Sequence, residues 1–184
     1  MAKPKKIIGY HFTGDKLRDG QPIPPIGEWL MHTGPVIICE SGLHYSLDPF
    51  DALQYAPGAI CHMVEIEEVV TTQSDKGVCR RRKILKSFDA TQILRYFARM
   101  QALSVIHLYP NGTDDVVFDY LITGNKAQEA AALAAARAAV WDAAGDAAGA
   151  AAWDAVRAAA WAAARAAAQL EFNSLINAEF AAIN

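Results

Sequence analysis

The residues that most directly suggest chemistry form a basic run, Arg-Arg-Arg-Lys at positions 80–83. Clustered guanidinium groups bind phosphate oxygens through paired, charge-assisted hydrogen bonds, so this run is a candidate for contacting an anionic ligand. Cross-strand ion pairing is the alternative that we favour, because a hairpin turning at 74–77 places the run opposite the acidic segment 65–68. Strand alternation puts Arg80 and Arg82 on one face and the other two residues on the opposite face. One basic face can therefore line a pocket.

Two cysteines and two histidines, Cys39, Cys61, His44 and His62, raise the possibility of a metal site. Their spacing matches no standard set of ligands, so we predict that the protein binds no metal. The sequence also shows no glycine-rich phosphate loop, no paired acidic motif and no arrangement of a nucleophile with a base. These side chains are therefore expected to pack within the fold or to lie exposed.

The predicted strands are short apolar runs bounded by turn signals. Residues 13–27 are predicted to form a polar, proline-rich loop between the first two runs. The strands are expected at 7–12, 36–39, 60–70 and 78–85, with a further short strand that carries His44 and Tyr45.

The predicted helices are marked by their capping residues. Asp48 is an N-cap with proline at the first helical position, and Pro57-Gly58 ends that helix. Asp89 forms a capping box with Gln92 at the start of a second helix, and a third begins at 114 or 115. Together with the strands, these helices predict an α+β domain over residues 1–123, with a small mixed or antiparallel sheet and packed helices.

Residues 124–184 have a different composition, since roughly three in five residues between 127 and 168 are alanine. Alanine favours helix strongly, so we predict a long alanine-rich helix or a helical hairpin. Four residues advance the chain by ~40° more than a full turn, so the repeat presents no fixed apolar face along a straight helix. Most of the other residues follow a four-residue spacing: Leu133, Arg137, Trp141, Gly145, Gly149, Trp153, Arg157, Trp161, Arg165 and Gln169.

We expect this tail to pack on the first domain or on a second copy of the chain, because small residues let helix backbones approach closely. The predicted partner is therefore another copy, forming a homo-oligomer through residues 126–184. The last turns regain an apolar face, which favours docking. That face consists of Leu170, Phe172, Leu175, Ile176, Phe180 and Ile183.

The overall composition excludes some classes of partner. A net charge of −3 and a pI near 5.9 make nucleic acid an unexpected partner. Arginine and aspartate interrupt the alanine-rich region every few residues, so we expect no membrane span. Three cysteines without CxxC spacing favour reduced thiols in a cytoplasmic protein.

Three short motifs occur in the order of a known enzyme family: Gly9-Tyr10-His11-Phe12-Thr13, Gly42-Leu43-His44-Tyr45-Ser46 and Ala52-Leu53-Gln54-Tyr55-Ala56. In this order they weakly resemble the ADP-ribosyltransferase fold. The resemblance implies that His11 holds the ribose of NAD and that Tyr45 stacks on nicotinamide, with Thr13 and Ser46 as hydrogen-bonding neighbours. The chain departs from the family at the later glutamate, because Glu65 and Glu67 come one strand early.

Nearly the whole chain also resembles a group of uncharacterised bacteriophage and bacterial proteins. The resemblance is carried by Gly-Leu-His at 42–44, Ala-Leu-Gln-Tyr-Ala-Pro-Gly at 52–58, Asp-Ala-Thr at 89–91 and the alanine-, tryptophan- and arginine-containing tail. It implies a phage-type accessory protein that acts against a host defence, in the cytoplasm of the host cell.

We therefore predict a binding protein that inhibits a host defence, by binding a host protein or by sequestering a nucleotide-like ligand. No cofactor is required, although NAD or another nucleotide is a candidate ligand. One alternative is a mono-ADP-ribosyltransferase that uses NAD, and another is a structural assembly module driven by the tail. The predicted ligand-binding residues are His11, Thr13, His44, Tyr45, Ser46, Arg80 and Arg82.

Overall fold

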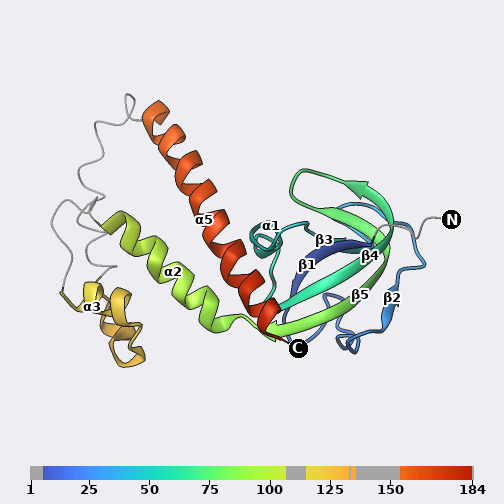
Figure 1. The fold of residues 1–184 in the computed structure, drawn as a ribbon, viewed down its shortest axis with the longest axis horizontal. Coiled ribbons are helices and arrows are strands. Elements are labelled where there is room, and N and C mark those ends of the chain that lie inside the picture. Colours follow the sequence, from blue (N-terminus) through green and yellow to red (C-terminus); the bar gives the residue numbers. More distant parts are fainter. Residues whose placement is uncertain (1–5, 107–114, 133, 136–153, 184) are drawn as a thin grey trace. The chain divides into compact units, whose positions relative to one another are not determined.

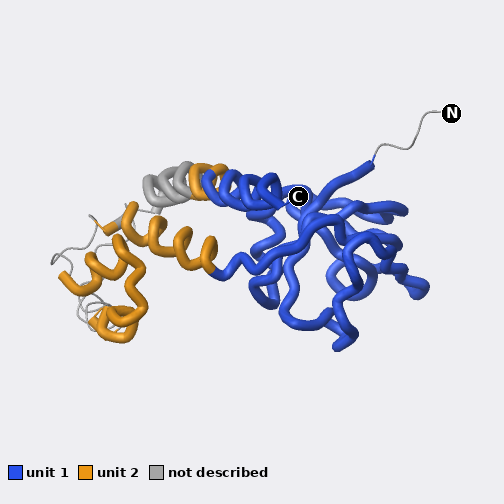
Figure 2. The backbone as a smooth tube through the Cα atoms, turned by 60° about the horizontal axis from the view of Figure 1, so that its bottom comes forward, with its two compact units in different colours: residues 1–91, 171–184 blue, residues 92–170 orange. Residues whose placement is uncertain are grey.

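The computed structural model describes residues 6–106, 115–132, 134–135 and 154–183. The chain divides into two compact units, which Figure 2 distinguishes by colour. Unit 1 comprises residues 1–91 together with 171–184, and unit 2 comprises residues 92–170. The boundaries of these units differ from those of the predicted domains 1–123 and 124–184. Unit 1 ends at residue 91 and also includes the end of the C-terminal helix.

Unit 1 is built on an antiparallel sheet, and the α+β class predicted from the sequence is confirmed (Figure 1). Its strand order is β1-β4-β5-β2, and β3 pairs with another part of β5. The strands of the described residues are β1 (Ile7–Thr13), β2 (Trp29–Met31), β3 (Leu43–Tyr45), β4 (Ile60–Thr72) and β5 (Gly77–Asp89).

The hairpin of β4 and β5 is the centre of this sheet, because β1 pairs with β4, and both β2 and β3 pair with β5. Its register brings the acidic and basic segments together. Arg81 Nη1 lies 2.7 Å from Glu67 Oε2, and Lys83 Nζ lies 2.8 Å from Glu65 Oε2. The predicted cross-strand ion pairs are therefore confirmed for two of the basic residues.

The predicted strand at 36–39 is wrong. The backbone turns here instead, because Glu40 N and Ser41 N both donate to the carbonyl of Ile37, at 3.0 and 2.8 Å. Cys39 adopts a left-handed conformation with φ of 70°, which a regular strand does not accommodate. The strand β2, Trp29–Met31, was not predicted; it follows the proline-rich loop and lies at an edge of the sheet.

Asp48 and Asp89 stand at the starts of the first two helices as predicted, but Asp89 bonds Thr91 and not the predicted Gln92. Helix α1 spans Pro49–Leu53, and the side chain of Asp48 accepts a hydrogen bond from the backbone N–H of Asp51 at 3.2 Å. Asp89 accepts from the backbone N–H of Thr91 at 2.8 Å, where α2 (Thr91–Val105) begins. Unit 2 continues with α3 (Asp115–Thr123) and the short 3-10 helix η2 (Lys126–Gln128).

The last element of the chain, α5 (Asp154–Ala182), brings its C-terminal turns into unit 1. Phe172, Ile176 and Phe180 are between 0 and 1% exposed there. The Phe180 ring packs edge-on against Phe88 with centroids 4.8 Å apart, and Phe172 contacts Phe50 in the same manner at 6.1 Å. The predicted docking of the last turns is therefore confirmed.

Polar contacts fix the register of this docked segment. Asn177 Oδ1 accepts a hydrogen bond from the Tyr10 hydroxyl at 2.7 Å, and Asn173 Oδ1 accepts from the backbone N–H of Phe50 at 2.8 Å. Lys86 Nζ donates to the carbonyls of Phe180 and Ile183 at 2.9 and 2.5 Å. A cation at this position also complements the negative end of the helix dipole.

Much of the alanine repeat lies outside the described residues, including 136–153, so the prediction of one helix or a hairpin stays a prediction. Among the helices that the structure describes, none is long and apolar enough to cross a membrane.

Because Phe180 fills the interface between the C-terminal helix and the sheet, we expect Phe180→Ala to lower the free energy of unfolding by about 3–5 kcal/mol. Chemical denaturation followed by circular dichroism measures this change. Leu170→Ala is the matched control, since Leu170 is 73% exposed and its truncation should change stability little. Equal effects of the two substitutions would contradict the docking of these turns in solution.

Candidate functional site

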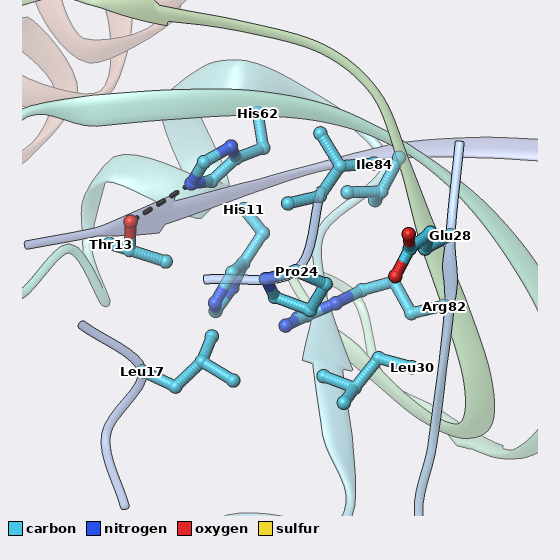
Figure 3. Close-up of a pocket in the computed structure, with 10 residues that line it drawn as sticks. His11, Thr13, Leu17, Pro24, Glu28, Leu30, His62, Arg82 and Ile84 are labelled. Carbon is cyan, nitrogen blue, oxygen red and sulfur yellow. Dashed lines mark hydrogen bonds between the residues drawn. The ribbon is translucent and has the colours of Figure 1, made fainter. Parts of the chain in front are cut away.

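A small cavity opens on the sheet face opposite the docked helix, beneath the loop that precedes β2 (Figure 3). Its walls come from the four strands β1, β4, β5 and β2 and from this loop. The lining residues are His11 and Thr13 of β1, His62 and Val64 of β4, Arg82 and Ile84 of β5, Leu30 of β2, and Leu17, Pro24 and Glu28 of the loop.

Strand register explains why these residues meet. His11 lies directly opposite His62 in the β1–β4 pair, and Leu30 lies opposite Arg82 in the β2–β5 pair. Directly opposed residues of an antiparallel pair project to the same face of a sheet. Tyr10, one position before His11, projects to the other face and contacts the C-terminal helix.

The two histidines of the cavity are held neutral. Burial lowers the pKa of His62 to about 4, and the positive charge of Arg82 acts in the same direction. Burial also holds the pKa of His11 well below its usual range, with Arg82, His62 and His44 adding to the effect. The His11 and His62 rings are stacked with centroids 6.5 Å apart, and His62 Nε2 lies 2.9 Å from Thr13 Oγ1.

Arg82 is the most unusual member of the cavity, because its side chain is charged and the residue is only 6% exposed. Burial lowers the pKa of its guanidinium to about 10, so it stays protonated at neutral pH. Its Nη1 donates to the backbone carbonyl of His44. Among the described residues no carboxylate lies within ion-pair distance of Arg82. The cavity thus contains a buried positive charge that the described residues do not neutralise.

Of the predicted site residues, the structure brings His11, Thr13 and Arg82 together. It does not bring Tyr45 to them. Tyr45 is 4% exposed and belongs to a hydrophobic cluster with Val64, Ile66, Cys79 and Ile84. Gly77 makes room for its ring, since a Cβ at that position would lie 2.4 Å from Tyr45 Cζ.

The other three predicted residues lie outside the cavity lining. His44 Nε2 accepts a hydrogen bond from the backbone N–H of Cys39 at 2.9 Å. The buried Ser46 pairs through its backbone with Tyr10, at 2.8 and 3.0 Å. Arg80 Nη1 donates to the carbonyl of Gly34 at 2.9 Å. These three positions therefore support the loops and strands around the cavity.

Sequence reasoning missed His62 and Glu28 as cavity residues. Pairing the predicted strands 7–12 and 60–70 in the correct register would have placed His62 opposite His11. Glu28 lies just beyond the predicted loop at 13–27. Local sequence does not indicate which part of a sheet a loop covers. Its carboxylate is exposed at the cavity wall.

The size of the cavity limits what can enter it. The free space inside is about 10 Å³, which accommodates about one water molecule. A whole nucleotide does not fit in this conformation, whereas one oxygen of an anionic group does, with the remainder of a ligand outside. No group of three or more potential metal ligands gathers among the described residues.

Comparison with known proteins gives a domain but no activity. Residues 7–96 match the family model described as a domain of unknown function, DUF7666. The match includes every residue that lines the cavity and ends before the C-terminal helix. No curated protein and no solved structure matches the chain.

The neutral state of His62 makes stability depend on pH. Between its ordinary pKa of 6.5 and about 4, the unfolded chain binds a proton at His62 that the folded chain does not. The contribution of His62 to the free energy of unfolding should therefore be fully present above pH 6.5. Acidification toward pH 4 should remove this contribution, which is about 3 kcal/mol. Urea denaturation between pH 4 and 7 measures the slope.

His62→Gln keeps a side chain able to bond Thr13 and removes the titration, so its slope should be clearly smaller. His32→Gln is the control, since His32 lies outside the cavity lining and bonds to the carbonyl of Pro35. Identical slopes for wild type and His62→Gln would show that His62 is not held neutral.

Proposed function

We propose that this chain is a phage-type accessory protein that acts by binding, countering a host defence by sequestering a nucleotide-like ligand. The observation that carries the proposal is the buried guanidinium of Arg82, unpaired with any carboxylate among the described residues. Burying an unpaired charge is costly unless a partner compensates it. A ligand that carries negative charge supplies that compensation.

Binding is favoured over catalysis by the chemistry of the cavity. Thr13 and His62 form a hydroxyl–imidazole pair, but an imidazole with a pKa of about 4 is a weak base at neutral pH. His62 Nδ1 has no partner among the described residues, so no carboxylate orients the ring. The pair therefore lacks the features that activate a hydroxyl nucleophile.

The alternative of a mono-ADP-ribosyltransferase requires the Tyr45 ring to face the ligand together with His11. Tyr45 instead packs among aliphatic side chains, and its hydroxyl lies 3.4 Å from Thr72 Oγ1. Glu28 does place a carboxylate at the cavity, as an enzyme of this class would need. The position of Tyr45 leads us to favour binding.

Self-association through residues 126–184 and a location in the host cytoplasm are further parts of the proposal. The highly exposed Leu170 at the end of unit 2 supports association, since a large apolar side chain gains from being covered. Cys39, Cys61 and Cys79 are free thiols, which agrees with a reducing compartment.

The proposal predicts that a nucleotide stabilises the folded chain. At about 100 times its dissociation constant, a ligand adds about 2.7 kcal/mol to the free energy of unfolding. Thermal unfolding with NAD, ADP-ribose, cyclic nucleotides and linear polyphosphates tests this expectation. We expect His11→Gln to reduce the shift and His32→Gln to leave it unchanged.

The same samples distinguish binding from turnover. Mass spectrometry of the recovered nucleotide should show it chemically intact after prolonged incubation. Release of nicotinamide from NAD would contradict pure binding and support the transferase alternative. No stabilisation by any nucleotide of the panel would contradict ligand sequestration.

A further inference from the structure

We propose that Arg82 and His11 together bind a terminal phosphoryl group, one oxygen of which enters the cavity. This inference rests on the proposed binding function and specifies which part of the ligand is recognised. It concerns a group shared by nucleotides and by free phosphate, so the two sources are separated by experiment below.

The neighbouring cations on β5 differ in burial and in ion pairing. Arg81 pairs with Glu67 and also lies over the Trp29 ring, 4.6 Å from its centroid. Lys83 pairs with Glu65 and lies over the same ring at 4.4 Å. These two residues are partly exposed, whereas Arg82 is buried and has only a neutral carbonyl as its described partner. Arg80 likewise has a carbonyl and no carboxylate as its described partner, but it is partly exposed, so Arg82 is the one buried cation of the run without a counter-charge among the described residues.

Arg82 and His11 both have N–H donors available at the cavity. A guanidinium has five N–H groups in a fixed fork, and the contact with the His44 carbonyl uses only Nη1. Figure 3 shows the guanidinium extending from β5 toward the ring of His11, which comes from β1. A neutral imidazole retains one N–H to donate. Donors that converge from two separate strands can both bond the single phosphoryl oxygen that enters the cavity, since a charged oxygen accepts more than one hydrogen bond.

Glu28 places a negative charge at the wall of the cavity. Glu28 is exposed and repels a multiply charged anion, so it should weaken the binding of free phosphate. The same carboxylate accepts hydrogen bonds from hydroxyl groups next to a phosphoryl group in a larger ligand. With space for about one water inside, the phosphoryl group enters end-on and the remainder of the ligand stays near Glu28.

The experiment measures thermal unfolding of the full chain in phosphate, sulfate, acetate and chloride at matched ionic strength. Phosphate should stabilise the wild type saturably and more than chloride or acetate. Arg82→Gln should weaken the fitted phosphate affinity by about tenfold or more, because it removes charge-assisted hydrogen bonds. Arg81→Gln is the matched control on the opposite sheet face and should stay within about twofold of the wild type.

Glu28→Gln provides a second, opposite readout that does not depend on the folding of the Arg82 variant. It removes negative charge at an exposed position and should strengthen phosphate binding. Equal stabilisation by all four anions would overturn the inference. So would an Arg82→Gln variant that binds phosphate like the wild type, or, if that variant does not fold, a Glu28→Gln affinity that does not rise.

Different results would contradict ligand sequestration and the phosphoryl site at Arg82. Nucleotide binding that is unaffected by Arg82→Gln would overturn the role of Arg82 and leave ligand sequestration standing. Phosphate binding that depends on Arg82, without stabilisation by any nucleotide, would contradict the nucleotide-like ligand and leave the phosphoryl site standing.

Discussion

The register of the β4–β5 hairpin is the constraint on which the rest of unit 1 depends. It pairs Glu65 with Lys83 and Glu67 with Arg81 on one face, which fixes Arg82 on the other. A slip by one residue would exchange these faces, expose the cavity-lining arginine and bury its two paired neighbours. The Glu67–Arg81 pair is partly exposed and contributes little energy alone, whereas Glu65 is buried beside Lys83; both pairs specify which register is correct.

The same hairpin contributes residues to both faces of the sheet. One face supplies Phe88 and, through β1, Tyr10 to the C-terminal helix, whose buried aromatic residues provide the apolar area that holds the sheet. The other face carries the cavity with its neutral histidines and its charged arginine. The cavity face also carries hydrophobic packing, because Val64 and Ile84 line the cavity and belong to the buried cluster around Tyr45.

Local patterns were sufficient to predict much of this fold. The cap at Asp48, the strands at 7–12, 60–70 and 78–85, and the facing charges of the hairpin follow from spacing within a few residues. Local patterns did not predict the position of Tyr45. An aromatic residue beside polar residues in a strand is compatible with a ligand site or with a core; here Tyr45 packs in the core, where Gly77 leaves room for its ring.

Long-range contacts decided the remaining features. His62 enters the site because β1 pairs antiparallel with β4, and Glu28 enters because the loop before β2 folds over the sheet. The apolar face at the chain's end predicted docking, but not that it would join residues 1–91 in one compact unit. The family match at 7–96 includes the cavity and not this helix, so the two features have separate places in the sequence.

The most direct test of the central claim is a crystal structure of the full chain grown with a nucleotide that carries a terminal phosphate. We expect phosphoryl density within hydrogen-bond distance of the Arg82 guanidinium and the His11 ring. A structure in which Arg82 pairs with a carboxylate of the protein, with water alone in the cavity, would contradict it.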